Sequence, residues 1–289
     1  MPVWCACVRR MSYPTSQLEQ NCVLYARMQN ARNLLMILKA INFKEMATCF
    51  LTANGIKVTV EDAKCMQANA FIQSGLFDEY QCRKSSAIFR INLSVLMECL
   101  GIFGSGNSFS GAPETYARLK MYYSGYGTPL TLILEDGGVV TDCSIKTHEA
   151  QETLDFEFYG TNVVNKIILK AECLRETFND LDMTSEVLKI LISSDAPYLQ
   201  LSTFGHNGST YIDYPKDSSI IESFECSEAQ TNSYQLLLLK PSTKALSQAS
   251  KVCIRTDSRG FLSLQYMIRI EDGQICFVEY LCAPEEDEE

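Results

Sequence analysis

The sequence has few of the features that mark membrane, secreted or zinc-binding proteins. No apolar run approaches the ~20 residues that a membrane-spanning helix needs. The opening MPVWCACVRR places its arginines after its apolar residues, the reverse of a signal peptide. Only two histidines are present, and the 13 cysteines include no CxxC pair, so closely spaced zinc ligands are missing. We therefore expect no metal and interpret the cysteines as buried free thiols from a reducing compartment, the cytosol or nucleus.

What the sequence does contain is typical of a soluble globular protein. The chain has 289 residues, of which 46% are hydrophobic and 21% charged, enough for one large core or two of ordinary size. The net charge is −10, and half of it comes from the terminal EEDEE, a block typical of a solvated tail. Net charge alone does not exclude a nucleic-acid partner, because the placement of the positive side chains decides that question.

Two similar stretches lie nearly half the chain apart. LILEDGGVV (132–140) and RIEDGQICFV (269–278) each read as a strand, a Glu-Asp-Gly turn and a second strand. Asp-Gly is a strong hairpin pair, so we expect a structural role for both turns. An alternating run that reaches a glycine precedes each stretch, ARLKMYYSGYG (117–127) in one and VCIRTDSRGF (252–261) in the other.

The match extends upstream. Each half has a strand running into an amphipathic helix (21–41 and 166–181), then further strands, then a strand running into a second helix (87–103 and 234–250). This shared order predicts two tandem α+β domains, each with two helices packed on a mostly antiparallel sheet. We assign a disordered extension to 1–20, the first domain to 21–142, a polar connector to 143–157, the second domain to 158–283 and the acidic tail to 284–289. The Gly/Ser-rich stretch 104–114 is expected to be a loop.

Positive side chains recur on the outer faces of two of the four predicted helices. In ARNLLMILKAI, a packing stripe of Leu34, Ile37, Leu38 and Ile41 leaves Arg32 and Lys39 on the opposite face. In KPSTKALSQASK, three lysines share one side if the helix is regular: Lys240, Lys244 and Lys251. Separated lysines suit a phosphate backbone, although a basic helix surface can also serve solubility alone. The other two helices add no such face.

Several long stretches resemble the PCNA-like sliding clamps, and more specifically the Rad-one subunits of the heterotrimeric DNA-damage checkpoint clamp. The resemblance runs from about residue 30 to 283, and its clearest parts are ATCFLTANGIKVTVEDAKCMQANAFIQSGLF, ETLDFEFYGTNVVNKIIL, LSTFGHNGSTYIDYPKDS, LLKPSTKAL and IRTDSRGFLSLQYMIRIEDGQICFVEY. The first 29 residues do not resemble the usual start of that family.

The resemblance implies a fold and a function. Three different subunits in a 1:1:1 ring enclose duplex DNA, a clamp loader places the ring at damage, and checkpoint-kinase and repair proteins dock outside. It implies a nuclear protein that is no enzyme and holds no cofactor. The implied DNA-facing residues are Arg32, Lys39, Lys240, Lys244 and Lys251. The implied partner-peptide connector contains Ile145, Lys146, His148, Glu149 and Leu154.

The residues leave two other functions open, a 3'-5' DNA exonuclease and a scaffold that binds only proteins. Asp155 and Glu157 form an Asp-x-Glu pair of the kind that holds metal in some exonucleases, and Asp180 and Asp182 form another close pair. Two-metal chemistry needs further converging carboxylates, and no second motif is recognisable. GSGNSFSG lacks the ending of a phosphate loop. The third hypothesis is a two-domain scaffold that binds proteins only, which the acidic balance favours mildly.

Overall fold

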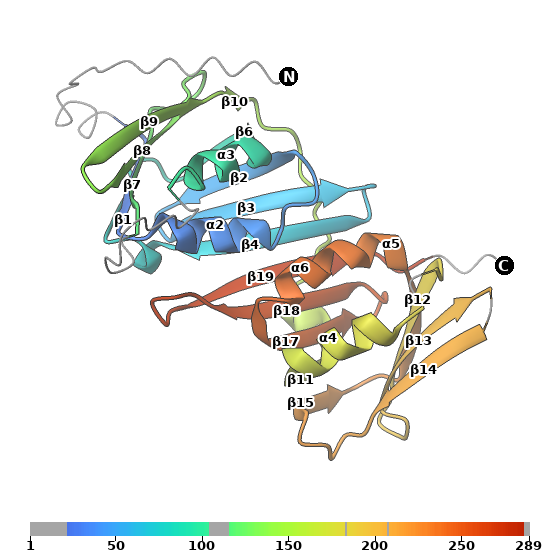
Figure 1. Ribbon diagram of the computed structural model, residues 1–289. Coiled ribbons are helices and arrows are strands. Elements are labelled where there is room, and N and C mark those ends of the chain that lie inside the picture. Colours follow the sequence, from blue (N-terminus) through green and yellow to red (C-terminus); the bar gives the residue numbers. More distant parts are fainter. Residues whose placement is uncertain (1–21, 104–115, 183, 207, 286–289) are drawn as a thin grey trace.

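The computed structural model describes residues 22–103, 116–182, 184–206 and 208–285. The predicted extension 1–20, the predicted loop 104–114 and residues 286–289 of the predicted tail lie outside this range. Figure 1 shows the described chain as two halves that follow one another along the sequence.

The first half follows the predicted order of elements. A strand and a helix come first, then five strands, a second helix and three strands, with a short strand at the end. Their bounds are β1 (Leu24–Met28), α2 (Ala31–Lys39), β2 (Met46–Thr52), β3 (Gly55–Asp62), β4 (Met66–Gln73), β5 (Glu79–Cys82), β6 (Ala87–Asn92), α3 (Leu93–Leu100), β7 (Arg118–Tyr123), β8 (Leu130–Asp136), β9 (Val139–Ile145) and β10 (Thr147–His148).

The second half repeats that order, which confirms two tandem α+β domains. Its elements are β11 (Val163–Lys170), α4 (Ala171–Asp180), β12 (Val187–Ile192), β13 (Leu199–Gly205), β14 (Gly208–Tyr214), β15 (Ile221–Cys226), β16 (Gln230–Gln235), α5 (Leu236–Leu239), the 3-10 turn η3 (Lys240–Ser242), α6 (Thr243–Leu246), β17 (Ala249–Asp257), β18 (Leu262–Arg269) and β19 (Ile275–Cys282). Pro241 lies in the first turn of η3 and has no N–H to donate, so α5 and α6 are separate short helices.

One sheet joins the two halves. β19, the last strand of the second half, pairs antiparallel with β4 of the first from Phe277–Phe71 to Cys282–Met66. The joint makes a ten-stranded sheet in the order β10-β6-β2-β3-β4-β19-β18-β17-β11-β15. Two smaller sheets flank it, β5-β1-β7-β8-β9 in the first half and β14-β13-β12-β16 in the second.

The helices cover one face of the ten-stranded sheet (Figure 1). The predicted stripe is buried at 0–3% exposure, with Leu34, Ile37 and Leu38 on α2 and Ile41 two residues after its end. Alternate strand residues such as Val58, Val278 and Ile254 face the same core. The opposite sheet face is therefore the outer face of the molecule, and strand residues between the buried ones point there.

The two Glu-Asp-Gly sequences lie at matching hairpins but not at matching positions. Glu135 and Asp136 still belong to the β8–β9 ladder, and Gly137 and Gly138 form the turn with φ of 56° and 81°. In the second half the loop between Arg269 and Ile275 is longer and contains the whole Glu-Asp-Gly. There the carboxylate of Glu271 accepts from the Asn30 amide at 2.9 Å, and that of Asp272 from Asn33. The second copy therefore helps to join the halves.

The structure moves the start of the connector. Residues 143–145 complete β9 of the five-stranded sheet, and Thr147–His148 form β10 against β6 of the ten-stranded sheet, so the chain leaves the strands of the first half only after residue 148. Prediction of a connector from residue 143 was wrong there because β9 is a half-exposed edge strand. Its polar Thr141, Asp142 and Ser144 hide the alternation that marks a strand.

The eleven described cysteines are free thiols, and four of them are buried. Burial raises the pKa of Cys49 and of Cys282 to about 12. Within the part of the chain that the structure describes, no helix has the length and apolarity needed to cross a membrane.

One hydroxyl ties three elements together at the joint. Tyr280 of β19 donates its hydroxyl hydrogen to the carbonyl oxygen of Ala40, which ends α2, at 2.6 Å. A longer branch of the same hydrogen bond reaches the carbonyl of Pro241 in η3 at 3.3 Å. The ring of Tyr280 is buried against Tyr266 and Phe43. The same side chain therefore packs the sheet, the first-half helix and the second-half helix.

We expect Tyr280→Phe to lower the free energy of unfolding by about 1–2 kcal/mol, because it leaves the buried Ala40 carbonyl without its donor. Urea unfolding followed by circular dichroism measures the change. Tyr126→Phe is the matched control, since Tyr126 is 80% exposed and the same deletion should change stability by less than ~0.5 kcal/mol. Equal midpoints for both variants would contradict the role given to Tyr280.

Candidate functional site

Four of the five predicted DNA-facing residues lie on the helix layer, next to the joint. Lys39 is exposed at the end of α2. Arg32 is half-buried near the start of α2, and its guanidinium lies 5.8 Å from the ring centre of Tyr116. Lys240 and Lys244 are exposed on η3 and α6. Lys244 donates to the carbonyl of Asn42, just after α2, so the two basic helices meet across the joint. Figure 1 shows α2 and α6 in the middle of the layer.

The outer two helices of the layer have the opposite character. On α3 the exposed charge is Glu98, and on α4 the exposed charges are Glu172, Glu176 and Asp180. The half-buried Arg175 of α4, whose Nη2 donates to the carbonyls of Leu246 and Ala249 at 3.2 and 3.4 Å, offsets one of these three charges and leaves α4 net negative. The positive charge of the helix layer is therefore concentrated on its two central helices.

Lys251 is not on a helix, and its predicted place beside Lys240 and Lys244 is wrong. The helix ends at Leu246, and Lys251 belongs to β17, where Val252 and Ile254 face the core. Alternation places the Lys251 side chain on the outer sheet face, where it pairs with Glu222 at 2.6 Å. The residues between Leu246 and β17, Ser247 and Gln248, include no Gly or Pro that would mark the end of a helix.

The five predicted connector residues have different environments. Ile145 is buried at 4% exposure in β9 and cannot take part in docking as an exposed residue. Lys146, His148 and Glu149 are exposed at the start of the segment. Leu154 is half-buried, and its backbone is held at both ends: its N–H donates to Glu61 at 2.6 Å, and its carbonyl accepts from Gln67 at 2.8 Å.

The far end of the connector is fixed to the second half. Phe156 is buried and packs edge-on against Phe261, with ring centres 5.6 Å apart. Arg259 donates to the Phe156 carbonyl at 2.7 Å and also to the buried carboxylate of Asp257 at 2.8 and 2.9 Å. The ring of Phe158 lies over the Arg255 guanidinium. Because Glu61, Gln67 and Arg255 point away from the helices, the connector runs over the outer face.

The candidate nuclease pair has a structural explanation. Asp155 accepts from the backbone N–H of Glu157 at 2.9 Å, which closes a local turn, and Glu157 has φ of 48°. The Glu157 carboxylate lies 3.9 Å from Arg259. Hydrogen bonds from Thr184 lower the pKa of Asp182. Among the described residues, no three His, Cys, Asp or Glu side chains are grouped as metal ligands.

A row of large side chains that was not predicted from the sequence crosses the outer face, and we call it the outer row. Cross-strand pairs place Ile88 beside Phe50, Phe50 beside Lys57, Lys57 beside Phe71, Phe71 beside Phe277, and Phe277 beside Met267. The Lys57 ammonium lies 4.4 Å from the centre of the Phe50 ring. Ile88 is 45% exposed and the others are half-buried. In the sequence, this row could have been suspected from large apolar residues at strand positions that face away from the core. Their alignment into one row depends on the β4–β19 joint.

Comparison with known proteins identifies the family. Residues 23–268 match the family model described as Repair protein Rad1/Rec1/Rad17. The chain belongs to this family. It is 63% identical to the human Cell cycle checkpoint protein RAD1 over 264 residues, which cover 91% of this chain and 92% of that protein. The mouse protein of the same name is 60% identical over 95% of this chain and 96% of that protein.

The Rad1 family is a PCNA-like clamp family, and the predicted fold class is confirmed: two tandem clamp domains with few helices on antiparallel sheets. The likeness also supports a DNA-damage checkpoint clamp protein. A more distant relative, the DNA repair exonuclease REC1 of Mycosarcoma maydis, is 26% identical over 62% of this chain and 50% of its own length.

The connector anchor can be tested at a single carboxylate. Glu61→Gln replaces the charged acceptor of the Leu154 N–H, so we expect about tenfold faster hydrogen exchange at that amide, equivalent to about 1.4 kcal/mol. Hydrogen exchange resolved by NMR measures it. Glu149→Gln, an exposed connector change, is the control and should leave Leu154 unaffected. An unchanged exchange rate in Glu61→Gln would show that the connector is held elsewhere.

Proposed function

We propose that the chain is one subunit of a heterotrimeric ring that encloses duplex DNA, is placed at damaged DNA by a clamp loader, and acts as a platform for checkpoint-kinase and repair proteins in the nucleus. The relatives named as checkpoint proteins support the damage response. The main observation in support of a ring is the β4–β19 joint, because the equivalent free strands predict how one subunit would pair with the next.

Each half has two strands of the kind that form the joint. Within the chain, only one strand of each half, β4 of the first and β19 of the second, is paired in this way. β19 is the third strand after the second helix of its half, and β9 has that position in the first half. β4 and β14 are each the third strand after the first helix. With β19 and β4 paired, β9 and β14 are left at the free ends of the two smaller sheets. A head-to-tail contact between β9 of one subunit and the β14 counterpart of the next repeats the joint and supports ring closure.

The two free edges have the character of surfaces that are covered in an assembly. Val139 and Val140 on β9 are 57% and 62% exposed, and Tyr211 on β14 is 56% exposed. An open sheet edge with exposed apolar side chains favours pairing with another chain. Three two-domain subunits, one copy of each, would give six similar units around the hole. The neighbours would be two other clamp subunits.

In such a ring the helix layer faces the DNA and the sheet faces outward. Lys39, Lys240, Lys244 and Arg32 would then lie near phosphates, where charge matters and base identity does not. The outer row and the connector above it form an apolar surface with exposed rims that suits partner peptides. Glu98 and the carboxylates of α4 would keep the DNA close to the central pair of helices.

The nuclease alternative has one observation in its favour, the name of the REC1 relative. Against it, Asp155 and Glu157 have local structural partners, and they do not share the face of a strand. The scaffold alternative keeps the fold and omits the DNA; it differs from the clamp in predicting no salt-dependent contact through Lys240 and Lys244.

Ring assembly is tested by the molar mass of the chain co-expressed with its two presumed clamp partners, measured by light scattering behind a sizing column. One species with one copy of each subunit is expected. Val140→Lys, which adds a charge to the β9 edge, should remove one neighbour. Ile88→Lys on the outer face should not. Elution of the unaltered chain as a monomer from the mixture would contradict the ring.

DNA contact is tested with Lys240→Glu and Lys244→Glu together in the assembled ring. Loss of two phosphate contacts should lower the slope of log K against log salt by about 1.8 and reduce retention on circular DNA. Lys251→Glu is the control, since a single charge reversal there lies on the outer face and should leave the slope unchanged. Equal retention of the double variant and the unaltered ring would favour the scaffold.

A further inference from the structure

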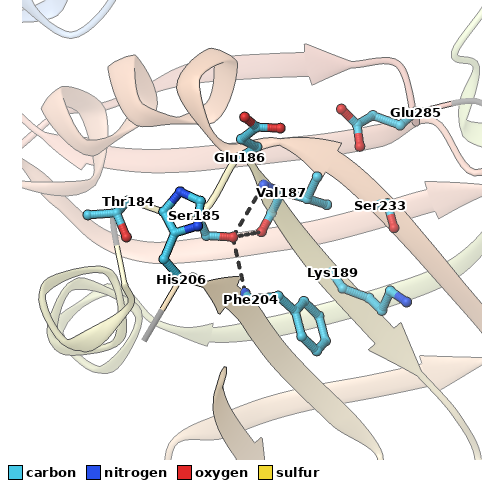
Figure 2. A pocket seen from close by; sticks show the side chains of 10 residues that line it. Thr184, Ser185, Glu186, Val187, Lys189, Phe204, His206, Ser233 and Glu285 are labelled. Atoms are coloured by element: carbon cyan, nitrogen blue, oxygen red, sulfur yellow. Dashed lines mark hydrogen bonds between the residues drawn. The ribbon is translucent and has the colours of Figure 1, made fainter. Parts of the chain in front are cut away.

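A groove in the second half has no assigned role. It has a volume of about 590 Å³ and lies between the segment leading into β12, the end of β13, β16 and the last described residue, Glu285 (Figure 2). Its floor is ordered by Ser185, whose hydroxyl donates to the Val187 carbonyl at 2.8 Å and accepts from the N–H groups of Val187 and Phe204 at 3.3 and 3.1 Å. These bonds fix the backbone on both sides of the groove.

The corresponding surface of the first half is covered by the chain's own connector. There His148 pairs with Arg90 of β6, and the chain continues so that Arg90 donates to Gln151 and Glu61 accepts from Leu154. In the second half, Glu285 donates its N–H to the Ser233 carbonyl of β16 at 2.7 Å, which is the equivalent start. Phe204 and Glu61 are each the last residue but one of their strands, β13 and β3. Among the described residues, the equivalent surface of the second half is reached only by Glu285, whereas an extended segment lies over it in the first half.

The groove offers an aromatic contact. Phe204 is 45% exposed and Tyr211 56% exposed, and their rings meet edge-on with centres 5.8 Å apart. The Lys189 ammonium lies 5.6 Å from the Phe204 ring centre, at one side of the groove. Exposed aromatic side chains beside a fixed backbone are typical anchors for a bound peptide side chain.

The charge around the groove is negative. Glu186 and Glu285 line it, and the Asp182 carboxylate lies against the backbone at Gly205 on the same side. Lys189 offsets one of these charges, and His206 is the other basic group in the lining. A basic ligand is therefore favoured over an acidic one.

We propose that this groove binds an extended basic segment of a partner protein, with one apolar side chain against Phe204 and flanking Lys or Arg side chains near Glu186 and Glu285. The occupant takes the place that the connector takes in the first half. All residues that line the groove belong to this chain, so the proposal does not depend on the ring or on DNA. A result that contradicts the clamp function would not contradict peptide binding in the groove.

The test uses the full chain and a blocked heptapeptide with one Leu flanked on each side by three Lys. The protein has only two histidines, His206 in the groove and His148 on β10, so imidazole NMR signals report the place of binding. The peptide should shift the His206 signal and leave His148 unchanged. A matched heptapeptide with Glu in place of Lys should shift neither. Equal response to both peptides, or a response at His148 alone, would overturn the proposal.

Two variants locate the contacts. Glu186→Lys and Phe204→Ala should each weaken binding of the Lys peptide by at least about tenfold, because one reverses a lining charge and the other removes the aromatic anchor. Glu98→Lys makes the same charge reversal and Tyr126→Ala a comparable loss of an aromatic ring at exposed sites elsewhere, and both should leave the affinity within about twofold. Equal effects at both pairs of sites would overturn the groove as the binding site. If removal of residues 286–289 alone shifts the His206 signal as far as the peptide does, the groove belongs to the chain's own tail, which also overturns the proposal.

Discussion

The pairing of β19 with β4 is the constraint on which the rest of the molecule depends. It converts two similar domains into one sheet and places α2 beside α6. It also brings Phe277 beside Phe71, which completes the outer row. The Tyr280 hydroxyl and the carboxylates of the 271–273 loop then bind elements of the other half on the helix side. Contacts from strands, helices and loops therefore all converge at one boundary.

The joint also gives the two faces of the molecule different chemistry. On the helix side, the basic residues lie where the two halves meet, and the acidic residues lie on α3 and α4 away from it. On the outer side, apolar residues cross the same boundary, and the connector passes over it with its backbone fixed at Leu154 and Phe156. The ten-stranded sheet therefore separates a charged surface from an apolar one, and both surfaces cross the boundary between the halves.

Most of the fold could be predicted from periodicity, and the misses have physical reasons. The α2 stripe and the alternation of β3 are strong because one side of each element is deeply buried. Edge strands such as β9 expose polar residues on one face and lose that signal. The basic helix ended earlier than expected, which put Lys251 in β17 on the wrong face. Periodicity within one segment carries no information about the register of β4 against β19, so the outer row could not be found. The open groove was missed for a related reason: it is visible only when the two halves are compared in space.

The burial of Cys49 and Cys282 determines how readily these thiols are oxidised. Oxidation to sulfenic acid proceeds through the thiolate, and a pKa of about 12 leaves about one thiolate in 10⁵ at pH 7 for Cys49 and Cys282. Both side chains lie in the core, with Cys282 beside Met66 at the joint. The conditions that oxidise exposed thiols would therefore spare these two side chains.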